Sequence, residues 1–138
     1  MWLQRVALGI AGIVGVGIIV IGVRFLLVPV ESAAGYGLPA LAADDPFLAV
    51  KGVRDIGSGL VLLTVFAMRK LDVLGWAMLA ASVMPLGDAL VVLAHGGPAY
   101  AVYGIHGATA VAMMAAAAVL ISGRVVRPAP RGSAVPAH

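Results

Sequence analysis

The sequence predicts an all-α fold, a bundle of four transmembrane helices with both termini in the cytoplasm. Hydrophobic residues make up 62% and charged residues 11% of the 138 residues, and the mean hydropathy is +1.09. In soluble domains, apolar residues average about 45–50% and charged residues about 25%. The apolar residues form four long stretches, and none of them alternates in polarity as a strand of a membrane β-barrel would. In hydrocarbon, only helices and closed barrels satisfy the hydrogen bonds of the backbone, so the four stretches are predicted to be helices.

The four predicted spans cover about residues 6–30, 47–68, 73–94 and 99–123. The first begins with 18 uncharged residues, Val6–Val23. That length is sufficient for a membrane-spanning helix, and it exceeds the apolar run of about 7–15 residues in a signal peptide. The other three are 22, 22 and 25 residues long. Residues 1–125 are therefore expected to form one membrane domain, and residues 126–138, rich in Pro, Ala and Ser, a disordered cytoplasmic tail.

Basic residues set the expected orientation of the bundle. With four spans, every lysine or arginine outside the spans falls on one side of the membrane: Arg5, Arg69, Lys70, Arg124, Arg127 and Arg131. The opposite side carries Glu31, Asp44 and Asp45. The positive-inside rule therefore predicts a multi-pass protein of the cell (inner) membrane with cytoplasmic termini. The basic excess lies beside the membrane without interleaved aromatic residues, so it indicates contact with the lipid bilayer and no nucleic-acid partner.

Small residues recur on two of the spans at helical spacing. They are Gly104, Ala108, Ala112 and Ala116 on the fourth span, and Ala7, Ala11, Gly15 and Gly22 on the first. Stripes of this kind let helix backbones approach closely, so they are predicted to be packing seams that would also allow homo-oligomers. Because Ala and Gly are abundant along the whole chain, chance spacing is the alternative explanation.

Ionisable residues gather at one depth in the outer half of the bundle. At about 1.5 Å per residue, all four spans place side chains roughly 10 Å below the outer boundary: Arg24, Arg54, Asp55, Asp88 and His106. Lys51 lies nearer the surface, where its long side chain can reach the headgroups. The expected rim consists of Tyr36, Glu31 and His95. Because the inner halves contain no ionisable residue, we expect a pocket open to the outside or to the outer leaflet.

These intramembrane charges need partners, because each costs about 2.5–3.5 kcal/mol on insertion scales. Lys51 and Asp55 are spaced i, i+4 and share a helix face. Arg54 points about 100° away from Asp55, which excludes a simple pair between them. Asp88, at matching depth on the neighbouring span, is therefore the predicted partner of Arg54.

The residues at this depth support three functional hypotheses. The cations Arg24, Lys51 and Arg54 exceed the two aspartates by one charge, unless Glu31 balances it. The first hypothesis is therefore binding of a small anionic or amphipathic molecule by Arg24, Tyr36, Lys51, Arg54, Asp55, Asp88 and His106. The second is a membrane-embedded acid–base enzyme, of isomerase or cyclase type, with His106, Asp55 and Asp88 as candidate catalytic residues. The third is a charge-paired structural plug without a ligand. Intramembrane charges favour a functional site over a plug.

No metal site and no cofactor are predicted. Asp88, His95 and His106 could supply ligands, but their spacing matches no standard motif. The chain also lacks cysteine and any Glu-x-x-His sequence.

Five short motifs occur in order along the chain. They are Arg24-Phe25-Leu26 followed by Pro29, Gly35-Tyr36-Gly37-Leu38-Pro39, Lys51-Gly52-Val53-Arg54-Asp55, Pro85-Leu86-Gly87-Asp88 and His106-Gly107-Ala108-Thr109. With them, the chain resembles the small bacterial and fungal membrane proteins catalogued as domain of unknown function 4267, over about residues 20–120. The resemblance implies a four-helix membrane protein and supplies no reaction.

Overall fold

Every regular element is a helix in the part of the chain that the structure describes, residues 1–38 and 45–123. The computed structural model contains, in chain order, α1 (Trp2–Leu27), α2 (Pro29–Tyr36), α3 (Pro46–Ala67), α4 (Leu71–Ala81), α5 (Val83–Ala94), the π-helix η1 (Tyr100–Gly107) and α6 (Ala108–Ser122). The predicted all-α class is therefore confirmed. The predicted cytoplasmic tail, residues 126–138, lies outside the described residues.

Pro29 ends the first long helix earlier than the hydropathy indicates. The predicted span runs to residue 30, but α1 ends at Leu27. A residue that precedes proline is disfavoured in the α conformation, and Val28 has φ −137° and ψ 66°. Pro29 then opens α2 at a position where its missing N–H is harmless. The segment expected as an outer loop thus contains a helix of 8 residues.

α3 agrees with the second predicted span to within one residue at each end. Pro46 stands in its first turn, and the Asp45 carboxylate accepts a hydrogen bond of 2.9 Å from the Phe47 backbone N–H. This cap satisfies one of the free donors at the helix N-terminus. After Ala67 a short turn through Arg69, with φ 55°, leads into α4.

The third and fourth predicted spans each consist of two helical segments. α4 stops at Ala81 and α5 starts at Val83, because Pro85 has no N–H to donate to the carbonyl four residues earlier. At the break, the Ser82 hydroxyl donates a hydrogen bond of 2.7 Å to the Leu79 carbonyl oxygen. The fourth stretch begins as η1, in which each N–H reaches one residue further back than in an α-helix, and continues as α6.

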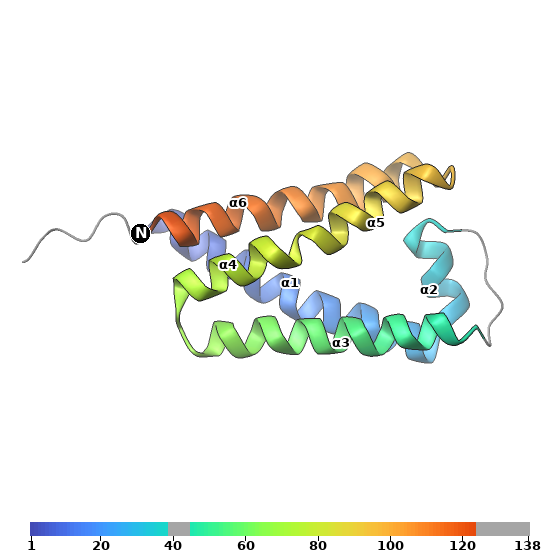
Figure 1. Ribbon diagram of the computed structural model, residues 1–138, viewed down its shortest axis with the longest axis horizontal. Coiled ribbons are helices and arrows are strands. Elements are labelled where there is room, and N and C mark those ends of the chain that lie inside the picture. The colour runs from blue at the N-terminus through green and yellow to red at the C-terminus, as the bar shows by residue number, and fades with distance from the viewer. Residues whose placement is uncertain (39–44, 124–138) are drawn as a thin grey trace, which may run out of the picture.

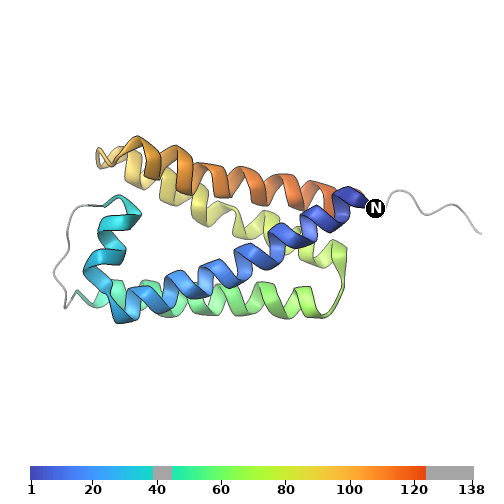
Figure 2. The ribbon, with the colours of Figure 1, turned by 180° about the vertical axis from the view of Figure 1, so that it is seen from behind.

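The long helices lie side by side at one end of the bundle and diverge at the other (Figure 1). α1 crosses the bundle, so that it lies beside α6 near its N-terminus and beside α3 near its C-terminus (Figure 2). The α1–α3 pair therefore separates from α5 and η1, and α2 lies across this open end. The N-terminus of α1, the α3–α4 turn and the end of α6 lie together at the opposite end.

Three stretches among the described residues are long and apolar enough to cross a membrane: Trp2–Leu27, Leu71–Ala94 and Tyr100–Ser122. α3 has a similar length, 22 residues, but Lys51, Arg54 and Asp55 reduce its apolar character. By length and composition, three of the four predicted spans qualify as membrane-spanning helices on their own. Whether α3 also qualifies depends on how its three charged side chains are arranged.

Glycines bring α1 and α3 into close contact. The predicted seam on the first span is confirmed, because all four of its members are buried: Ala7, Ala11, Gly15 and Gly22. A Cβ atom at Gly59 would lie 2.6 Å from the Gly15 carbonyl oxygen, and one at Gly52 would lie 2.8 Å from that of Gly22. Only glycine at these positions lets the two backbones approach this closely.

The seam predicted on the fourth span is wrong at its beginning. Gly104 and Ala108 are exposed, whereas Ala116 is buried. The residues that α6 buries are Ala110, Met113, Ala116, Ala117 and Leu120. Because η1 and α6 differ in hydrogen-bonding register, a spacing of four residues does not follow one face across their junction.

Replacing Gly59 by alanine should destabilise the protein. The new Cβ would lie 2.5 Å from Ile19 Cγ1 and 2.6 Å from the Gly15 carbonyl oxygen, and such overpacking costs about 1–3 kcal/mol. Gly57→Ala on the same helix is the matched control, because its Cβ would meet nothing within 4 Å. Thermal unfolding in detergent, followed by circular dichroism, should show a lower Tm for Gly59→Ala alone. An equal loss for Gly57→Ala would contradict this account of the seam.

Candidate functional site

A cavity of about 330 Å³ lies where the α1–α3 pair diverges from α5 and η1, with α2 along one side. Side chains from the middle of the long helices, including Ile18, Met84 and Met113, make its inner part apolar. Its polar lining residues are Arg24, Glu31, Ser32, Tyr36, Lys51, Asp55, Asp88, His106 and Thr109. Six of the seven predicted ligand-binding residues thus line one cavity, and Arg54 does not.

Lys51 and Asp55 form the predicted i, i+4 ion pair on α3. The Lys51 Nζ–Asp55 Oδ2 distance is 2.6 Å, and the two side chains are only 18% and 10% exposed. The ammonium turns into the bundle instead of extending toward the membrane surface. It lies 4.8 Å from the ring centroid of Phe25 and 4.5 Å from that of Tyr36. One carboxylate and two aromatic rings therefore compensate this charge.

Arg54 lies outside the cavity, and the predicted Arg54–Asp88 pair is not formed. Its side chain is 60% exposed and forms a long ion pair with Asp55, with 4.0 Å between Nε and Oδ1. The prediction that excluded this pair was therefore wrong. As the spacing predicts, Arg54 is rotated away from the buried face of α3. It borders a shallow depression with the exposed residues Ala49, Val50 and Val53. Arg54 was predicted to be a ligand-binding residue, but it faces away from the cavity.

His106, in the last turn of η1, is 5% exposed and contacts α2. Its Nε2 lies 2.9 Å from the Tyr36 carbonyl oxygen, and the two rings are 4.2 Å apart at an angle of 59°. Because a carbonyl oxygen only accepts, Nε2 must carry the hydrogen that it donates. The other ring nitrogen, Nδ1, makes no hydrogen bond within the described residues. A backbone carbonyl thus orients His106, and neither of the other candidate catalytic residues, Asp55 and Asp88, makes this hydrogen bond.

Tyr36 joins the elements around the cavity, a role that the sequence analysis, which placed it at the rim, did not predict. Its ring packs edge-on against Phe25 at 5.9 Å, between Lys51 and His106. Its hydroxyl oxygen is buried and has no hydrogen-bond partner among the described residues. Burial raises the pKa of this hydroxyl well above its usual value near 10, and the neighbouring Asp88 carboxylate raises it further.

Gly37 is the local signal that could have indicated the position of Tyr36. Its φ is 94°, and an added Cβ would lie 2.6 Å from that of Ala101. The residue after α2 therefore has to be glycine, because both the conformation and the contact exclude a side chain. This close contact fixes the end of α2 against the start of η1.

The remaining charged residues change the expected charge balance. Arg24 lies three residues before the end of α1, not about six, and is exposed where it lines the cavity. Glu31, in α2, is also exposed, and Asp88 is half-buried. Two cations thus face three carboxylates around the cavity, so the predicted excess of one positive charge is replaced by an excess of one negative charge.

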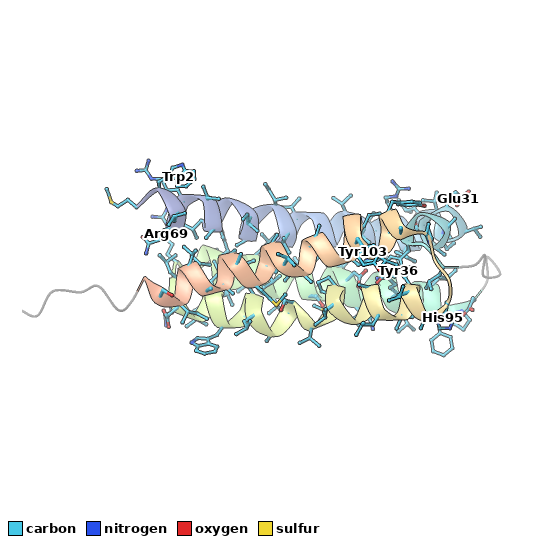
Figure 3. All side chains as sticks on the ribbon, turned by 90° about the horizontal axis from the view of Figure 1, so that it is seen from above. Trp2, Glu31, Tyr36, Arg69, His95 and Tyr103 are labelled. Carbon is cyan, nitrogen blue, oxygen red and sulfur yellow. The ribbon has the colours of Figure 1, made fainter. Side chains whose placement is uncertain are left out.

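His95 lies outside the cavity, at the same end of the molecule as Glu31 and opposite Trp2 and Arg69 (Figure 3). Its Nδ1 lies 2.8 Å from the Val91 carbonyl oxygen of its own helix. Within residues 1–38 and 45–123, no three His, Asp or Glu side chains gather closely enough to hold a metal ion.

These features define an all-helical protein with apolar helices of membrane-spanning length and a cavity lined by charged and aromatic residues. Residues 15–120 match the sequence profile of the family described as Domain of unknown function (DUF4267), and the chain belongs to this family. The resemblance seen in the sequence motifs is thereby confirmed. Neither the curated proteins nor the solved structures contain a significant match to the chain. Because the family description assigns no activity, the function has to be argued from the residues.

Tyr36 should remain protonated when the pH rises through 10. The fold holds the hydroxyl neutral, whereas in the unfolded chain it ionises near pH 10. Its contribution to stability is therefore complete below about pH 10 and is lost progressively above it. In a Tyr100→Phe, Tyr103→Phe variant, Tyr36 is the sole tyrosine, and ultraviolet absorbance then reports its ionisation directly.

In this variant the phenolate signal should appear only well above pH 10, together with the loss of helical circular dichroism. The two substitutions themselves should be mild, because Tyr100 and Tyr103 are 61% and 66% exposed. Reversible ionisation near pH 10 in the intact fold would show that the Tyr36 hydroxyl is not enclosed.

Proposed function

We propose that the chain is a multi-pass protein of the inner membrane with four spans, and that its cavity in the outer half binds a small amphipathic molecule. The observation that carries the proposal is the cavity itself, which is apolar toward the middle of the bundle and charged toward α2. Such a lining complements a ligand with an apolar body and a polar head group.

The arrangement of charges on α3 supports its role as the fourth span. Lys51 and Asp55 are turned inward and neutralise one another, which removes most of the penalty for placing them in hydrocarbon. The outward face of the helix is apolar, with Val53, Leu60 and Val61 all more than half exposed. Arg54 remains on this face, where a long side chain can extend toward the lipid headgroups.

The outer surface of the whole bundle supports membrane insertion. Large apolar side chains are exposed along the other long helices too, for example Ile13 on α1, Leu90 on α5 and Val111 on α6. Soluble monomers rarely expose apolar surface on this scale. Trp2 and Arg69 lie at the end that the positive-inside rule assigns to the cytoplasm (Figure 3).

The observations favour an amphipathic ligand over a simple anion. Lys51 already has a carboxylate partner, and Arg54 does not line the cavity. Of the three cations expected to hold an anion, only Arg24 remains without a partner among the described residues. The cavity lining carries more carboxylates than cations, which disfavours a small anion without an apolar part.

The binding hypothesis also explains more than the two alternatives. The acid–base hypothesis has less support, because the hydrogen bond of the His106 ring goes to the Tyr36 carbonyl oxygen and to neither of the candidate catalytic aspartates, Asp55 and Asp88. A structural plug accounts for the Lys51–Asp55 pair but not for the cavity beside it.

Single cysteines should report the proposed topology, because the chain contains none of its own. His95→Cys introduces a thiol at the end of α5, and Met68→Cys introduces one at the α3–α4 turn. A membrane-impermeant maleimide should label His95→Cys in intact spheroplasts and Met68→Cys only after lysis. Both native residues are exposed, so accessibility within the fold does not limit either reaction. Equal labelling before lysis would contradict the proposed crossing of the membrane by α4 and α5, which separate these two positions.

A cavity-filling substitution should remove bound amphiphiles. Met84→Trp adds an indole to the cavity lining, whereas Leu90→Trp adds one to the outward face of the same helix, where Leu90 is 60% exposed. Mass spectrometry of lipids and metabolites that copurify with each protein should show a species that is retained by wild type and Leu90→Trp. It should be depleted at least severalfold in Met84→Trp.

Circular dichroism and elution as a single species provide the folding control for both tryptophan variants. Identical profiles for wild type and a folded Met84→Trp would contradict ligand binding in the cavity.

A further inference from the structure

We propose that the head group of this ligand is an ammonium, so that the cavity takes a lipophilic primary amine. The inference rests on the proposed function, binding of an amphipathic molecule, and specifies its polar end. It assigns Asp88 as the counter-ion and places Tyr36 and His106 beside it. Three independent features of the cavity lining support this assignment.

The first feature is that the cavity already holds an ammonium group, that of Lys51. This group is bound by the Asp55 carboxylate at 2.6 Å and lies within 4.8 Å of the ring centroids of Phe25 and Tyr36. A carboxylate combined with aromatic faces is a favourable environment for an organic cation. The chain's own lysine thus shows, on the lining of this cavity, the kind of environment proposed for the amine.

The second feature is the charge that remains after this internal pair. Asp88 is half-buried on the lining and forms no ion pair within the described residues. Arg24 and Glu31, the other two charged lining residues, are exposed and of opposite sign, so water or headgroups can solvate both. The carboxylate that most needs a partner is therefore that of Asp88, and a positive group supplies it.

The third feature is the set of hydrogen-bonding atoms on the same cavity lining as Asp88. The Tyr36 hydroxyl lies close enough to the Asp88 carboxylate for that charge to act on it, and its oxygen has no hydrogen-bond partner among the described residues. In the neutral imidazole, Nδ1 of His106 is an acceptor when Nε2 carries the hydrogen. An ammonium has three donors and no acceptor, and the carboxylate, the hydroxyl oxygen and Nδ1 can each accept one.

The test compares three dodecyl amphiphiles that differ only in head group: dodecylamine, dodecanol and dodecanoate. Each is titrated calorimetrically into the full chain in maltoside micelles at mildly alkaline pH, where the amine is positive and the carboxylate negative. The amine should bind on the order of tenfold more tightly than the alcohol, as a charged hydrogen bond implies. Dodecanoate should bind least tightly.

Two matched substitutions locate the preference in the cavity. Asp88→Asn keeps the shape of the side chain and removes its charge, so the amine should bind no more tightly than the alcohol. Asp72→Asn is the same substitution in the first turn of α4, at the opposite end of the bundle, and should leave the preference for the amine unchanged. Loss of the preference in Asp72→Asn would contradict the assignment to Asp88.

The outcomes separate this inference from the proposed function. Equal binding of amine and alcohol by the wild-type chain would overturn the ammonium head group and leave amphiphile binding standing. Tightest binding of dodecanoate would overturn it in favour of an anion at Arg24. Saturable binding of none of the three would overturn both proposals. Because these comparisons use the wild-type chain, they decide the matter even if Asp88→Asn does not fold.

Discussion

The structure depends on burying an ammonium and a carboxylate within an otherwise apolar bundle. An unpaired charge would be costly there, and α3 carries both Lys51 and Asp55 on its inward face. Their contact removes much of that cost, but the ammonium also needs favourable contacts with the apolar side chains around it. The ring of Phe25 provides one of these contacts, and it reaches Lys51 because glycines allow α1 to lie close against α3. The close packing of α1 against α3 and the position of the Lys51–Asp55 pair therefore both follow from the need to stabilise a buried ammonium.

The ring of Tyr36 provides the second of these contacts, and its position explains why the chain reverses direction after α1. Tyr36 can lie over Lys51 only if α2 folds back across the open end of the bundle. Pro29 starts this return, and the positive φ of Gly37 ends it against η1. Once there, the backbone carbonyl of Tyr36 holds His106. A single residue on a short helix thus links α1, α3 and η1, and it does so next to the cavity.

The positions of the long apolar stretches and the Lys51–Asp55 pair could be predicted from the sequence, because hydropathy and the i, i+4 spacing are local properties. The partner of Arg54 could not, since depth along a helix says nothing about the direction in which a neighbouring helix presents its side chains. The sequence analysis placed Arg54 and Asp88 at one level and assumed that they face one another. Arg54 instead faces outward, and its absence from the lining, together with the presence of Glu31 there, reverses the sign of the charge balance around the cavity. The contacts of Tyr36 depend on tertiary folding, and Gly37, the one local signal, marks only where its helix ends.

The orientation of His106 depends on how many residues the π-helix η1 contains, as well as on the residue type. The hydrogen bonds of η1 span one residue more than those of an α-helix, so the segment contains a residue that regular α geometry would not accommodate. Ala101, which meets Gly37, and His106, which bonds the Tyr36 carbonyl oxygen, stand five positions apart. In a regular α-helix these two positions would be turned by about 140° from one another, whereas hydrogen bonds that span five residues bring them toward one face. The extra residue of η1 thus lets the imidazole and the docking surface for α2 lie on the same side of the helix.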